Sequence, residues 1–136
     1  MENRYLFRAK RKDNGEWIFG NLIQTDDGVY IIQNYVPQHS IKNCEVDPAT
    51  ICQCTGLKDK NGKLIWENDI VAYWDTYSTE NGLTEADCIG KVVWDDETIS
   101  FQVTNRLSAE SYEVLDDECS VVGNAIDNPE LLEVRL

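Results

Sequence analysis

Short runs of β-branched and aromatic residues, each ended by turn-forming residues, constrain the fold of this chain more than any other sequence feature. Residues 17–23 follow Asn14-Gly15, a pair that supplies the positive φ of a tight hairpin turn. Residues 98–103 alternate polar and apolar side chains, as half-buried strands do. Many short strands at close spacing predict a mainly β chain, folded as a small β-barrel or sandwich with little helix.

The length of 136 residues suits one domain spanning 1–136. Within it we expect an N-terminal β-hairpin region at 1–53 and a barrel-like acidic region at 54–136. The part near residues 54–124 resembles a small SH3-like barrel, because a turn and strand, a long loop and a Gly-Lys-Val-Val hairpin follow one another there. Further strands are expected at 5–9, 29–32, 51–55, 70–74, 90–94 and 119–124.

Three segments between or after these strands need separate predictions. Residues 75–87 are polar with Asn81-Gly82 in the middle, so we expect a long loop that could act as a mobile arm. Residues 108–115 fit either a strand or a helical turn. Asn128 before Pro129 predicts one helical turn, with Asn128 as its cap.

The charge is strongly acidic and unevenly distributed. Residues 1–63 carry nine basic and eight acidic side chains, whereas residues 64–136 carry three and seventeen, and the whole chain has a net charge of −13. Such a chain repels phosphate backbones, so we expect no direct binding of nucleic acid. The exception would be a basic groove beside Trp17. The residues of that groove would be Arg4, Arg8, Lys10, Arg11 and Lys12. The simpler expectation is that these residues form a strand and a turn with solvated charges.

Five cysteines, an odd number, predict thiols in a reducing cytoplasm. Cys52 and Cys54 are two residues apart, so on a strand both lie on one face, where they act as small hydrophobes. A metal site is the alternative, from the only histidine and three cysteines: His39, Cys44, Cys52 and Cys54. Their spacing does not match the usual pairs of zinc ligands, so we expect no metal and place His39 in a loop.

Sequence motifs of catalysis and targeting are missing. No G-x-S-x-G, G-x-x-x-x-G-K-[ST] or H-E-x-x-H pattern occurs, and we expect neither an enzyme nor a cofactor. Asp95 and Asp96 could hold a divalent cation for phosphoryl chemistry, but Asp is also typical of a turn, where we place both. No apolar run is long enough for a membrane span or a signal peptide, and a cytoplasmic protein is expected.

Four segments spread along the chain carry a more specific signal. They are Phe7-Arg8-Ala9 with Trp17-Ile18-Phe19-Gly20; residues 46–50 with 55–63 and 65–71; Gly90-Lys91-Val92-Val93-Trp94-Asp95-Asp96; and residues 122–132. In this order, over nearly the whole length, they resemble the YopX family of phage and prophage proteins. The resemblance implies a mostly β fold and a phage or prophage origin in a bacterium. It implies no reaction and no catalytic residues.

This chain departs from the family pattern at two places. Where the family usually has Gly-Gln-Tyr, this chain has Cys52-Gln53-Cys54. Where the family has Glu-Gly-Asp, it has Glu67-Asn68-Asp69. Asn tolerates positive φ better than other non-glycine residues do, so we expect Asn68 to form the same turn.

Two functions remain to be weighed. One is a non-enzymatic accessory protein that acts through protein contacts, with itself as a homo-oligomer or with a host protein. The alternative is an acidic decoy that occupies the nucleic-acid-binding face of a host protein. The residues that would mimic phosphates in that case are Asp95, Asp96, Glu97, Asp116, Asp117 and Glu118.

Overall fold

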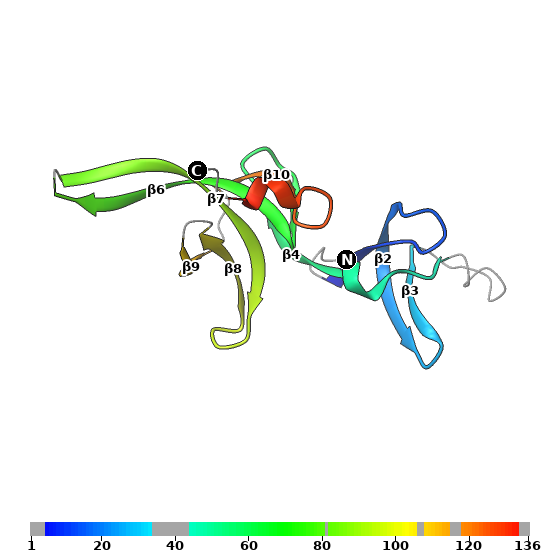
Figure 1. Cartoon of the computed structure of the whole chain (residues 1–136). Coiled ribbons are helices and arrows are strands. Elements are labelled where there is room, and N and C mark those ends of the chain that lie inside the picture. Colours follow the sequence, from blue (N-terminus) through cyan, green and yellow to red (C-terminus); the bar gives the residue numbers. More distant parts are fainter. Residues whose placement is uncertain (1–4, 34–43, 81, 106–107, 115–117, 134–136) are drawn as a thin grey trace. The chain divides into compact units, whose positions relative to one another are not determined.

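The computed structural model describes residues 5–33, 44–80, 82–105, 108–114 and 118–133, with the backbone alone at 74–79, 83–87, 105 and 108–114. Two five-stranded antiparallel sheets run in the orders β3-β2-β1-β4-β5 and β10-β6-β7-β8-β9 (Figure 1). The strands are β1 (Phe7–Lys10), β2 (Trp17–Thr25), β3 (Gly28–Ile32), β4 (Cys52–Lys58), β5 (Leu64–Trp66), β6 (Asp69–Thr79), β7 (Gly82–Asp95), β8 (Ser100–Asn105), β9 (Ser108–Val114) and β10 (Ser120–Asn124). The 3₁₀ helices η3 (Pro48–Thr50) and η4 (Pro129–Leu132) are one turn each.

This architecture confirms the prediction of a mainly β chain with little helix. Of the two alternatives, barrel and sandwich, the described strands follow the second, because neither sheet order closes on itself. The chain divides into two compact units, Met1–Gly56 and Leu57–Leu136, with the division inside β4. The grouping of both into one domain stays a prediction.

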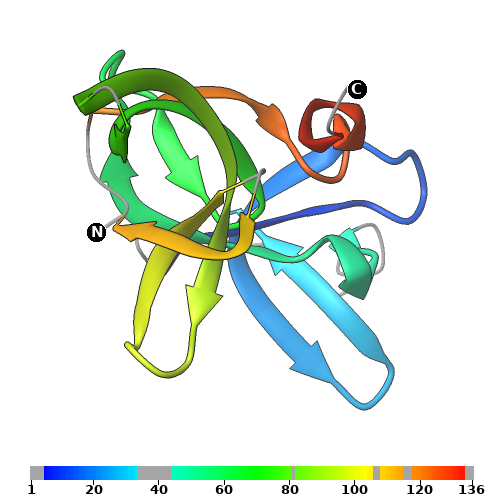
Figure 2. The same ribbon diagram turned by 60° about the vertical axis from the view of Figure 1, so that its left-hand side comes forward.

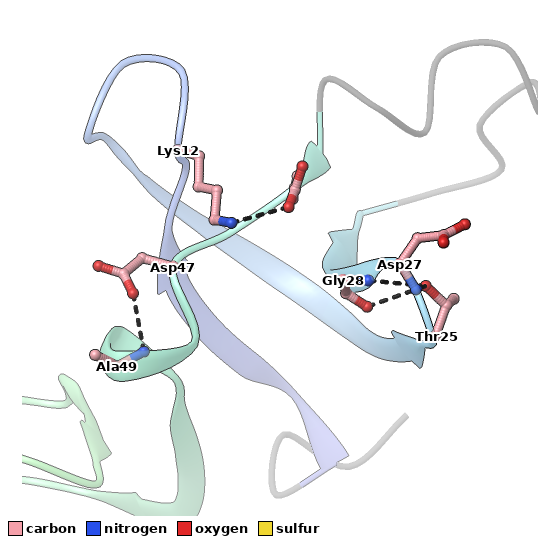
Figure 3. A network of polar contacts seen from close by, with 7 residues as sticks. Lys12, Thr25, Asp27, Gly28, Asp47 and Ala49 are labelled. Carbon is pink, nitrogen blue, oxygen red and sulfur yellow. Dashed lines mark hydrogen bonds and ion pairs between the residues drawn. The ribbon is translucent and has the colours of Figure 1, made fainter.

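The first unit is built on β1, β2 and β3. Phe7 lies opposite Gly20 and Leu22 opposite Ile31, so that alternate residues share one face of the sheet. Apolar residues of that face form the core, which Val46 completes from outside the sheet: Ala9, Ile18, Ile31 and Val46. Local polar contacts fix its turns (Figure 3). The Thr25 hydroxyl accepts from the N–H groups of Asp27 and Gly28, and the Asp47 carboxylate accepts from Ala49 N–H at the start of η3.

The core of the second unit brings β5 against the second sheet. Ile65 of β5 packs with Val71, Val92 and Val103, which come from β6, β7 and β8, and with Cys119. This layered packing is that of a sandwich. Gly90 permits the close approach of β8, since a Cβ at this position would lie 1.7 Å from the Thr104 carbonyl oxygen. A short apolar strand and a single glycine therefore set the geometry of this core.

The prediction of a long loop at 75–87 is wrong. Residues 75–79 and 82–87 continue β6 and β7, which pair without a break from Ile70↔Lys91 to Thr79↔Gly82. Thr and Tyr favour strands even where the segment is polar, and Gly82, at φ 108°, supplies the tight turn. The other open segment, 108–115, is the strand β9 over Ser108–Val114.

Two predicted turns are observed with one difference in detail. Asn68 has a φ of 70°, which confirms that Asn adopts the turn where the family has Gly. The helical turn after Asn128 is present as η4. The Asn128 side chain, however, accepts a hydrogen bond from Asn124 N–H at 3.2 Å and makes none to η4. It therefore joins the helical turn to the end of β10.

Candidate interaction surfaces

The described cysteines considered for a metal site differ in their solvent exposure. Cys52 and Cys54 are fully buried, as predicted for small hydrophobes on one strand face, and Cys44 is half-buried. The Cys52 thiol lies 3.3 Å from the Thr50 carbonyl oxygen. His39 falls outside the described residues. Within the described ranges, no group of three or more His, Cys, Asp or Glu side chains could hold a metal ion.

The basic residues of the N-terminal cluster interact within the first unit. The Arg8 guanidinium lies 4.7 Å from the centroid of the Trp17 ring, and the Lys10 ammonium lies 5.5 Å from it. Arg8 is only 8% exposed, so the expectation of solvated charge was wrong for this residue. The aromatic face attracts both cations, because the ring quadrupole is negative above its plane.

Two further cations of this cluster pair with acids of the same unit. Arg11 contacts Asp13 at 2.6 Å, and Lys12 contacts Glu45 at 3.0 Å (Figure 3). Arg4 lies outside the described residues. The charges of Arg11 and Lys12 are therefore offset locally, and this reduces the potential that a phosphate backbone would meet.

Two acids of the second unit are buried and serve the fold. Asp59, in the turn between β4 and β5, accepts hydrogen bonds from the N–H groups of Asn61, Lys63 and Val121 at 2.9 Å each. Burial alone would raise the pKa of Asp59, but these bonds and the nearby Lys63 charge outweigh it and lower the pKa. Asp69 accepts from Trp66 N–H at 2.8 Å. Sequence reasoning predicted the turn at Asn68, beside Asp69, but did not identify these roles.

Asp95 and Asp96 stabilise the turn between β7 and β8. The Asp95 carboxylate accepts from the Thr98 hydroxyl at 2.7 Å and from Glu97 N–H at 3.3 Å. The Thr98 bond is the main cause of the lowered pKa of Asp95. Asp96 accepts from the Trp94 indole N–H at 2.8 Å. Asp96 lies in the turn as predicted, whereas Asp95 is the last residue of β7, directly before the turn.

The same turn carries an exposed apolar residue in an unfavourable backbone conformation. Ile99 has a φ of 52° and is 74% exposed. A β-branched residue rarely adopts this left-handed conformation, which costs about 1–2 kcal/mol for a residue with a Cβ and which glycine usually occupies in hairpin loops. Both views show this turn at the free end of the β7–β8 hairpin (Figures 1 and 2).

Trp94 adds a second exposed apolar group near that end of the hairpin. Its ring packs edge-on against Phe101, with 5.1 Å between centroids, and yet is 42% exposed. We call the residues Trp94, Asp96, Glu97 and Ile99 the tip surface. It combines two exposed apolar side chains with two carboxylates. Among the other acids considered as phosphate mimics, Glu118 is exposed, and Asp116 and Asp117 lie outside the described residues.

Comparison with known proteins identifies a matching family and similar solved structures. The family model described as YopX protein matches residues 6–133. The crystal structure of protein EF1440 from Enterococcus faecalis is similar with a TM-score of 0.47 and 24% sequence identity, over 93% of this chain and 96% of that one. No curated protein matches this chain. Within the described residues, no helix has the length and apolar character needed to cross a membrane.

Proposed function

The chain belongs to the YopX family, and on that premise we propose that it is a phage or prophage accessory protein of the bacterial cytoplasm. It catalyses no reaction and acts through contacts with other proteins. The observation that carries this proposal is Ile99, an apolar residue exposed at the hairpin end.

An exposed isoleucine at positive φ costs conformational free energy, and a binding role best explains why it is present. Its side chain is mostly in water, so it gains little from burial, while its backbone conformation opposes folding. Glycine would remove the strain without losing a core contact. Binding by a partner would bury the isoleucine and offset its cost. Trp94 supports this, because tryptophan is enriched among residues that dominate protein interfaces.

The acids most suited to chemistry are engaged in local structure, which favours a binding protein over an enzyme. Asp95 and Asp96 accept hydrogen bonds of their own turn, and Asp59 accepts three backbone N–H groups. A general acid or base must instead direct its oxygen at a substrate.

Affinity capture from bacterial host lysate tests the proposal. We compare the wild-type chain with Ile99→Gly and Ile99→Asn, which both suit positive φ and both remove the apolar side chain. We expect both variants to lose a partner that the wild type retains, although both stay folded. The control is Val122→Thr in β10, a change of similar shape at a residue that is also exposed, at 47%. Equal capture by wild type and both variants would contradict a role for the tip surface.

The acidic decoy is the second candidate, because the charge is concentrated in one unit. Residues 57–136 carry six basic and eighteen acidic side chains, against six and seven in residues 1–56. A partner held by this charge would dissociate when salt is raised from about 0.05 to 0.5 M, since screening weakens exposed charge pairs. Capture that resists salt but needs Ile99 favours the first candidate.

A further inference from the structure

The outer part of the β6–β7 hairpin pairs only with itself among the described strands. β10 pairs with β6 at residues 69–72, and β8 pairs with β7 at residues 92–95. Beyond those flanking strands, the pairs from Tyr73↔Cys88 to Thr79↔Gly82 form a two-stranded ribbon, which we call the arm (residues 73–79 and 82–88). Figure 1 shows this ribbon extending past the strands that flank its base.

Such an arm is incomplete by itself. At about 3.4 Å per residue its seven pairs reach roughly 24 Å, and an isolated two-stranded ribbon is marginally stable in water. Both edges present backbone N–H and C=O groups that another strand could bind. Natural edges are often protected by Pro, Lys or other charged side chains. The arm contains no Pro or Lys, and its charged residues are Asp75, Glu85 and Asp87. The arm is therefore suited to pair with a further strand.

The hairpin register shows which groups face outward. Two residues separate Thr79 from Gly82, and the pair that closes such a hairpin is hydrogen-bonded. Pairing alternates from there, so the next pair, Ser78↔Leu83, has its backbone groups directed outward. The outward positions are thus 74, 76 and 78 on β6 and 83, 85 and 87 on β7.

The two edges differ in charge. The outward positions of β6 are Trp74, Thr76 and Ser78, which are all uncharged. On β7 two of the three are acids, Glu85 and Asp87. Antiparallel pairing of β7 with its own copy, centred on either acid, would set that acid opposite itself, and like charges directly opposite each other destabilise a sheet. Self-pairing of β6 around Thr76 sets no two charged residues opposite each other, so β6 is the more favourable edge.

We propose that two copies of this chain join through their β6 edges, antiparallel, around a two-fold axis at Thr76. Thr76 then lies opposite Thr76 of the second copy, and Trp74 lies opposite Ser78. The three outward pairs form about six backbone hydrogen bonds and convert two two-stranded arms into one four-stranded sheet. Such a contact uses the same surface on both copies, which two-fold symmetry requires.

This inference deepens the proposed function by naming a second copy as one partner, and it does not involve the tip surface. The two proposals also differ in their response to salt. Each copy carries a net charge of −13, so screening this repulsion should strengthen self-association. Salt would weaken the binding of a basic partner instead. Failure of one proposal is therefore separable from failure of the other.

Sedimentation equilibrium of the full chain at about 0.05 and 0.5 M salt tests the inference, with Thr76→Pro and Glu85→Pro as matched variants. Thr76 and Glu85 lie opposite each other, and proline removes an outward N–H at either position without breaking the ladder inside the arm. We expect wild type and Glu85→Pro to be dimers, and Thr76→Pro to dissociate at least ten-fold more readily. A monomeric wild type at several hundred µM and high salt would overturn the inference, as would a dimeric Thr76→Pro.

Hydrogen exchange of the wild-type chain gives a test without any variant. On dilution from dimer to monomer, the amides of Trp74, Thr76 and Ser78 should exchange faster. The amides of Glu85 and Asp87 should not change, because they remain in water in both states. Protection of the β7 amides instead would assign the contact to the other edge and overturn the inference.

Discussion

The first unit covers its sheet edge and offsets its charges, whereas the second leaves both open. The outer side of β3 is covered by a bridge from Tyr30 to Glu45 and by the hydrogen bond from Val46 N–H to Val29. Lys12 pairs with Glu45 of the same unit. In the second unit, by contrast, the arm has no flanking strand among those described, and acids outnumber bases by twelve.

The difference separates structural stability from binding capacity. A unit that covers its sheet edge and pairs its charges internally has little to gain from a partner. A unit with a strained apolar tip, an open strand edge and excess charge gains from partners at each of these features. We therefore place the binding functions in residues 57–136, and the following predictions test this contrast, starting with the largest effect.

Asp59→Ala should cause the largest loss of stability. It removes a buried carboxylate that accepts from three N–H groups, one of them on the half-buried Val121, and we expect a loss of about 3 kcal/mol in the free energy of unfolding of the second unit. Urea denaturation measures it. The control is Asp26→Ala in an exposed turn of the first unit, which should change stability by less than about 0.5 kcal/mol. Equal effects of the two changes would show that the Asp59 contacts are unimportant.

Acid should destabilise the second unit at the same residue. The folded-state pKa of Asp59 is lowered, so its contribution is complete above the unfolded pKa of about 4 and is lost as pH falls through the lower folded pKa. Hydrogen exchange should show Asn61, Lys63 and Val121 amides losing protection before those of β1 and β2. In Asp59→Asn this pH dependence should disappear. Simultaneous loss of protection in both units would contradict the assignment.

Ile99→Gly should raise stability while it removes partner binding. Relief of the positive φ is worth about 1 kcal/mol, reduced in part by the greater entropy of glycine in the unfolded chain. Thermal unfolding of the variant and wild type measures the gain. The same change at Ile23, which is exposed at 39% in an ordinary strand of the first unit, should instead destabilise. A loss of stability in Ile99→Gly would mean that Ile99 contributes to folding.

Lys12→Ala should have the smallest effect. The pair with Glu45 is exposed to solvent, and such pairs contribute between about 0 and 1 kcal/mol. We expect a change under about 0.5 kcal/mol in urea denaturation, and a smaller one at 0.5 M salt. A change above about 2 kcal/mol would show that the first unit depends on this pair more than its exposure implies.

Sequence predicted the features that depend on local chemistry. The turn at Asn68 was predictable because a positive φ depends on the type of a single residue. The burial of Cys52 and Cys54 was predictable because side chains two residues apart on a strand lie on the same face. The strands of the arm were missed because the alternating pattern arises where one face of a strand is buried, and residues 75–87 are polar. Asp59 was missed because one of its donors, Val121, is 62 residues away. Ile99 was assigned to a strand, since β-branched residues rarely occupy a turn at positive φ.

The bond between Asp59 and Val121 also has a consequence for the order in which the chain folds during synthesis. The core and turns of the first unit use residues up to Ile51, which leave the ribosome early. The carboxylate of Asp59 is synthesised soon afterwards, but its partner in β10 emerges only after 62 more residues. Until then the turn between β4 and β5 lacks one of its donors, and the second unit cannot complete its sheet. We therefore expect nascent chains to fold in two steps, with the acidic unit exposed to chaperones and proteases for longer than the first.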